Sequence, residues 1–166
     1  MTSSIAEILA KPTSAGRYLS AGEFNSIKGF IQNGEDRLKV AEFLSANSTA
    51  LVSKAFRDLT EDRPNLIDVG GSFSDHSILA RYIEQLDILL RFITYSTVAG
   101  DDSPLKEWLH DLPAKYIGMG LSISLIAAAV RFLSVSTLER LDLLRIEDET
   151  KDFIRSCFSG IQSSLA

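Results

Sequence analysis

Apolar residues recur every three or four positions along most of this chain. The clearest case is the stretch from about 75 to 99, with apolar side chains at positions 79, 82, 83, 86, 89, 90 and 93. This is the spacing of one buried face of a helix. Ile78, Ile88 and Phe92 widen the apolar stripe, and Gly100 is a natural helix stop. The pattern therefore predicts one long helix, covered on most sides.

The same spacing predicts further helices before this stretch. Ser20 and Glu23 have the spacing of a capping box, which should open a helix that ends at Asn33. A second helix should follow, and Asn47 is expected to cap a third one. The segment from 60 to 71, which contains Pro and paired Gly residues, is predicted to be a loop.

Helical signals continue to the C-terminus. A short helix should start at Ser103-Pro104, because proline is favoured at the first helical position. Residues 123–135 are apolar and small and predict a core helix, Ser136 with Glu139 again has capping-box spacing, and a final helix should carry Cys157. Sustained period-two alternation is lacking, so the predicted fold class is all-α.

Composition narrows the range of functions. The net charge is −5, and the 17 Lys and Arg residues are scattered, which argues against nucleic acid as a partner. A single cysteine excludes an intrachain disulfide, and no apolar run approaches the ~20 residues of a membrane span. His76 and His110, the only histidines, form no metal or catalytic constellation. We expect a cytoplasmic protein that is not an enzyme.

Several short sequence groups, in order and spacing, resemble phycobiliproteins, most of all the allophycocyanin-like branch. They are Arg17-Tyr18-Leu19-Ser20, Gly34-Glu35, Asn47-Ser48-Thr49, Arg63-Pro64, Gly70-Gly71, Arg91-Phe92-Ile93-Thr94-Tyr95, Val98-Ala99-Gly100-Asp101 and Tyr116. The resemblance implies a globin-like fold with an N-terminal helical hairpin. It suggests a single domain in which residues 1–33 form the hairpin and residues 34–166 the globin body.

The resemblance also implies a linear tetrapyrrole, phycocyanobilin or a related bilin. Tyr82 stands where the family has its bilin-anchoring cysteine, so any bilin should be bound noncovalently, or be absent. Gln85 replaces an aspartate that binds pyrrole N–H groups, Glu84 replaces an arginine that pairs with a propionate, and Arg81 could take over that pairing. The expected tetrapyrrole-binding residues are Ser72, Arg81, Tyr82, Glu84, Gln85, Ile88, Leu89, Trp108 and Tyr116.

The resemblance also predicts which residues form the contact between subunits. Family subunits pair through an aspartate, here Thr13, and an arginine matching Arg91. A homodimer would lose both copies of this contact, whereas a heterodimer with a phycobiliprotein-type subunit would keep one. Residues expected at the interface are Tyr18, Phe24, Ile27, Arg91 and Tyr95. Light harvesting or bilin handling is the leading function, in the cytoplasm or at the cytoplasmic face of a thylakoid membrane. The alternative is an unpigmented interaction or regulatory module that keeps the fold and subunit interface.

Overall fold

The structure is a computed structural model that describes residues 5–166. Helices are the regular elements of this part of the chain, as the sequence predicts. In order they are α1 (Ile5–Ser14), α2 (Ala21–Gln32), α3 (Gly34–Asp62), the 3₁₀ turn η1 (Pro64–Leu66), α4 (His76–Ala99), α5 (Ser103–Leu109), α6 (Leu112–Gly118), α7 (Ile123–Leu141) and α8 (Asp148–Ser164).

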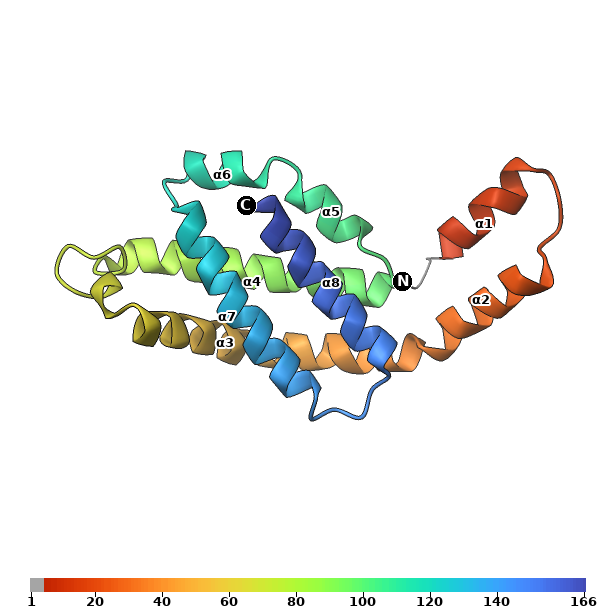
Figure 1. Ribbon diagram of the computed structural model, residues 1–166, viewed down its shortest axis with the longest axis horizontal. Coiled ribbons are helices and arrows are strands. Elements are labelled where there is room, and N and C mark those ends of the chain that lie inside the picture. The colour runs from red at the N-terminus through yellow and green to blue at the C-terminus, as the bar shows by residue number, and fades with distance from the viewer. Residues whose placement is uncertain (1–4) are drawn as a thin grey trace.

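The helices form a globin-like body with an arm at one end. Figure 1 shows α3 and α4 lying alongside each other, α7 and α8 crossing over them, and α5 and α6 along one edge. Helices α1 and α2 project from the end at which α3 begins. Their antiparallel pair is called the N-terminal arm below; residues 1–4 of the predicted hairpin lie outside the described residues.

One continuous apolar core holds the body together. Leu86, Leu89 and Ile93 of α4 are fully buried, which confirms the apolar stripe along this helix. The prediction that the helix is covered on most sides is wrong at Ile78 and Ile83, which are 37% and 39% exposed because they lie on its solvent side. Small residues on α7, among them Ala128 and Ala129, are also buried and allow α7 to approach α3 closely. Because most of the apolar surface lies in these crossings, the body derives its stability mainly from packing between helices.

Two predicted helix starts are wrong. Helix α3 runs without a break past Asn47, whose side-chain amide donates a hydrogen bond to the carbonyl of Phe43 one turn earlier. Helix α7 likewise continues through Ser136, which is buried. Both residues have side chains suited to capping. However, the apolar stripe of each helix continues across them, and burial of that stripe outweighs the local preference.

The ends of α4 follow the sequence. Asp75 caps its start by accepting a hydrogen bond from the Ser77 N–H at 2.8 Å, and Gly100 ends it in the left-handed conformation at φ 72°. Helix α5 begins at Ser103, as predicted; its N-cap residue Asp102 makes no side-chain cap hydrogen bond, and the Ser103 N–H donates instead to the Asp101 carboxylate at 2.8 Å.

The arm is held mainly by its own two helices. Residues Ile8 and Pro12 of α1 are buried, and α1 packs on α2, so this short helix docks on its own chain. Ser20 and Glu23 form the predicted capping box of α2.

A charge interaction also links the arm to α5 of the body. Hydrogen bonding to Asp102 raises the pKa of Lys106 on α5, and attraction to Glu7 of α1 adds a smaller contribution.

Candidate functional site

Tyr82, at the position of the expected anchor, is turned into the protein. Its side chain is only 2% exposed, and its hydroxyl accepts a hydrogen bond from the Ser122 N–H at 2.8 Å. Its ring meets Phe73 edge-on, with centroids 5.1 Å apart. Ser122 immediately precedes α7, so Tyr82 joins α4 to the start of α7. The side chain has no nucleophilic thiol, and its ring is packed in the core against Phe73.

Aromatic packing on α3 fixes the loop between η1 and α4. Phe73 packs edge-on against Phe56 of α3 at 5.7 Å, and its N–H donates to the Leu66 carbonyl at 2.7 Å. At Gly71 a Cβ would lie 2.3 Å from the carbonyl oxygen of Asn65, so only glycine fits there. Ser72, a predicted site residue, is exposed on this loop.

Three polar groups near this region have no partner within the described residues. The Tyr116 hydroxyl is completely buried without a hydrogen bond, and burial raises the pKa of that hydroxyl. Gln85 is 8% exposed, and its amide makes no hydrogen bond. Arg81, one turn before Gln85, is exposed and free of ion pairs. Of the three, the Tyr116 hydroxyl is the fully buried group, and since an unpaired buried polar group costs ~1–3 kcal/mol, it is a candidate to bind a ligand.

The other predicted site residues divide between core and surface. Leu89 is fully buried and Ile88 half-buried on α4, whereas Glu84 is exposed to solvent. Trp108 is half-buried: it stacks on Phe92 at 5.3 Å and meets Tyr116 edge-on at 6.4 Å. Phe92, Trp108 and Tyr116 thus form a row of aromatic rings. The sequence did not predict that Phe92 belongs to it, because the rings meet only when α5 and α6 pack near α4.

Arg91 and Tyr95, two of the predicted interface residues, line a groove of about 310 Å³ between α3 and α4. Arg91 pairs with Asp87 at 3.2 Å on the rim, and both side chains are exposed. Tyr18 and Phe24 lie exposed on the arm, Ile27 is half-buried there, and Thr13 is exposed on α1. Within one chain the structure therefore places the expected contacts on two separate surfaces.

The histidines and the cysteine lie outside this site. His76 is exposed at the first turn of α4, and His110 is exposed and paired with Asp111 at 2.8 Å. Neither is placed as a haem ligand within a buried pocket. Cys157 is buried on α8, where burial and, to a smaller degree, the charge of Asp102 raise the pKa of its thiol to about 12.

Comparison with known proteins identifies the family. A sequence model described as "Phycobilisome protein" matches residues 7–165. The chain belongs to the phycobilisome protein family. It is 37% identical over 116 residues to the allophycocyanin alpha chain of Cyanidium caldarium and 35% identical to that of Galdieria sulphuraria. It is 36% identical to the allophycocyanin alpha subunit of a Picosynechococcus strain. Each comparison covers 69% of this chain and 72% of the relative.

Membership in this family gives the class of function. The chain is a phycobiliprotein, a bilin-binding, light-harvesting protein and not an enzyme. This assignment is favoured over an unpigmented interaction module. Members of the family form heterodimers and larger oligomers. Among the described residues no single helix is long and apolar enough to cross a membrane; by length and composition one sharply bent pair, α6 with α7, passes that test.

Proposed function

We propose that this phycobiliprotein binds its linear tetrapyrrole noncovalently, along α4 and against α6. The unpartnered, fully buried Tyr116 hydroxyl is the observation that carries the proposal. Gln85 supplies a carbonyl oxygen that can accept a pyrrole N–H, and Arg81, on the adjacent turn, can pair with a propionate. In this proposal the three groups would pair with polar atoms of a bilin, and Trp108, whose ring meets that of Tyr116 edge-on at 6.4 Å, would supply an aromatic wall.

Thioether attachment is not part of the proposal. It requires a reactive thiolate near the pigment. Tyr82 has no sulfur, and Cys157 lies on α8, buried, with a thiol that stays protonated at neutral pH because its pKa is raised to about 12. Phycocyanobilin or a related bilin is the pigment we propose.

The test is a comparison of native and denatured pigment. We expect protein co-produced with bilin-synthesis enzymes to absorb visible light and to lose that pigment in acidic urea. After denaturing electrophoresis its band should stay dark in zinc-enhanced fluorescence. Tyr116→Phe should weaken binding by roughly fivefold, the loss of one hydrogen bond. A colourless native protein would refute pigment binding, and a fluorescent band would refute the noncovalent mode.

We further propose that the chain docks as one half of a heterodimer with a phycobiliprotein-type subunit. Arg91 and Tyr95 on the groove would meet the partner's N-terminal hairpin, and residues 1–33 of this chain would reach the partner. Thr13 cannot replace the carboxylate that would pair with an arginine, which disfavours a homodimer. The cytoplasmic surface of the thylakoid membrane is the location we propose for this assembly.

Sedimentation of the full chain, alone and with allophycocyanin subunits, tests this pairing. We expect complexes with the subunits, and these should lose mass when residues 1–20 are deleted. Thr13→Asp should add self-association, because it restores the carboxylate, while Ser14→Asp, one position along α1, should not. A chain that stays monomeric with those subunits would contradict the proposal.

A further inference from the structure

The start of α3 is held by two distant parts of the body. A single residue, Asn33, separates α2 from α3, and its backbone is itself helical at φ −78° and ψ −2°. No side-chain cap marks the boundary on the α3 side. Backbone hydrogen bonds still join the two helices, from the Asn33 N–H to the Gly29 carbonyl at 3.0 Å and from the Arg37 N–H to the Asn33 carbonyl at 3.1 Å, and side-chain contacts with the body add to them. Figure 1 shows α2 rising away from the axis of α3 at this point.

The first contact is a layered stack at the end of α4. The Arg37 guanidinium lies 4.0 Å from the centroid of the Phe30 ring, and its Nη1 donates to the Phe30 carbonyl at 2.9 Å. This carbonyl is near the C-terminus of α2, where a cation is favourable. The stack thus ties the last turn of α2 to the first turn of α3.

Gly100 completes this stack from the body. A Cβ at Gly100 would lie 2.5 Å from Cε2 of Phe30 and 3.2 Å from Nε of Arg37. The ring edge of Phe30 therefore occupies the space that any other residue at position 100 would need. Gly100 also adopts φ 72°, so it both ends α4 and makes room for the arm.

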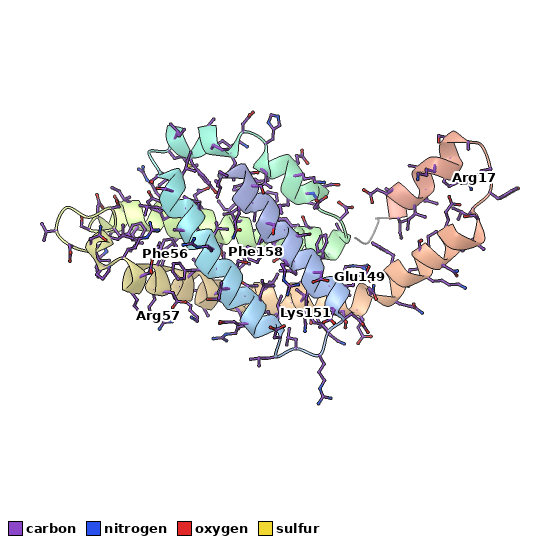
Figure 2. All side chains as sticks on the ribbon, in the orientation of Figure 1. Arg17, Phe56, Arg57, Glu149, Lys151 and Phe158 are labelled. Atoms are coloured by element: carbon purple, nitrogen blue, oxygen red, sulfur yellow. The ribbon has the colours of Figure 1, made fainter. Side chains whose placement is uncertain are left out.

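The second contact comes from the start of α8. The Asn33 amide donates to the Glu149 carboxylate at 2.5 Å, and Asp36 accepts from the Glu147 N–H at 2.6 Å. Burial lowers the pKa of Arg37, and attraction to Glu149 opposes that shift. Figure 2 shows Glu149 at the start of α8, next to the start of α3, and Arg17 at the far tip of the arm.

We propose that Phe30, Arg37 and Gly100 are positioning residues that set the angle of the N-terminal arm before a partner subunit binds. Fixing the arm in advance removes an ordering cost from association, so the preset angle should strengthen docking. This inference rests on the proposed heterodimer only for its effect on affinity. The geometry of the arm in the isolated chain is a separate consequence, which can be measured without a partner.

Gly120 offers a matched control for Gly100. Both glycines have φ +72°, so alanine strains the backbone alike at either position, but a Cβ at Gly120 meets nothing within 4 Å. Spin labels on Asn25→Cys of α2 and Ser159→Cys of α8, both exposed sites, report the distance from arm to body. Buried Cys157 should remain unlabelled.

We expect Gly100→Ala to shift or broaden this distance distribution, and Gly120→Ala to leave it as in the parent protein. Arg37→Met, which keeps the aliphatic stem but loses the charge and hydrogen bond, should also broaden it and supplies a second test if Gly100→Ala folds poorly. Binding to allophycocyanin subunits should weaken about tenfold in both variants but not in Gly120→Ala. Unchanged distances in Gly100→Ala and Arg37→Met would overturn the inference. If the parent protein binds no allophycocyanin subunit, the proposed heterodimer is refuted. The spin-label distances between arm and body then still show whether these residues set the angle of the arm.

Discussion

The Tyr82 hydroxyl accepts a hydrogen bond from the Ser122 N–H at 2.8 Å, across 40 positions of the chain. Ser122 is the residue that precedes α7, and no side-chain hydrogen bond caps this helix locally. The Tyr82 hydroxyl therefore satisfies a backbone N–H donor at the start of α7 and holds α7 against α4. Tyr82, which the sequence resemblance places at the expected anchor position, therefore has a structural role of its own.

Removing only this hydroxyl should destabilise the protein. Tyr82→Phe leaves the Ser122 N–H unpaired, and we expect the free energy of unfolding to fall by ~0.5–1.5 kcal/mol. Chemical denaturation measures this change. Tyr116→Phe is the matched control, because that buried hydroxyl has no partner to lose, and its stability should be unchanged or slightly higher. Equal losses in the two variants would show that the Ser122 hydrogen bond contributes nothing.

Restoring the anchor should change the mode of pigment binding. Tyr82→Cys with Gln85→Asp supplies a thiol and a carboxylate for the pyrrole N–H groups, so bilin should bind more tightly and become covalent where a lyase or autocatalytic route accepts the site. Loss of the buried ring should cost on the order of 3 kcal/mol, which bound pigment offsets. Zinc-enhanced fluorescence after denaturing electrophoresis measures attachment. A folded double variant that takes up no bilin would contradict the proposed site.

Cys157 should be inert in the folded protein. Burial raises the pKa of its thiol to about 12, so at pH 8 the thiolate population is roughly three orders of magnitude below that of an exposed cysteine. A thiol reagent should therefore label the protein only at the rate at which it unfolds. Labelling should become immediate in denaturant. Rapid reaction of the native chain, or a bilin bound to Cys157, would contradict its place in the core.

The pairing of Arg17 with Glu23 gives the arm a pH dependence. Hydrogen bonding from Arg17, then from the Ser20 N–H, lowers the pKa of the Glu23 carboxyl to about 2, from an unfolded value near 4.5. A depressed carboxyl pKa stabilises above the unfolded value, so this contribution should be lost as the pH falls from 4.5 toward 2. Arg17 is exposed and Glu23 is half-buried at the surface, so the effect is local to the start of α2.

Titration of the Glu23 carboxyl by NMR checks this assignment. Arg17→Gln removes the main cause and should raise the pKa toward its ordinary value, while high salt should do so only partly. If Arg17→Gln leaves the titration of Glu23 unchanged, the capping box with Ser20 is sufficient by itself.

The sequence by itself determined the elements whose signals are local. Helix α4 follows from an apolar stripe with Asp75 before it and Gly100 after it, and each of these signals acts within a few residues. The capping box at Ser20 and the burial of Cys157 follow in the same way, from spacing and from position on an apolar face. The identity of the residue at position 82 likewise excluded a thioether there, since no fold can supply a missing sulfur.

Only the tertiary structure decided the rest. Asn47 and Ser136 have the local preference of helix caps, but α3 and α7 continue through them because burying a long apolar stripe outweighs a single cap. The hydrogen bond from Ser122 to Tyr82 and the stack of Phe30 against Gly100 join segments 40 and 70 positions apart. Such contacts leave no periodic trace in the sequence, because they form only when the helices pack and bring the two segments together.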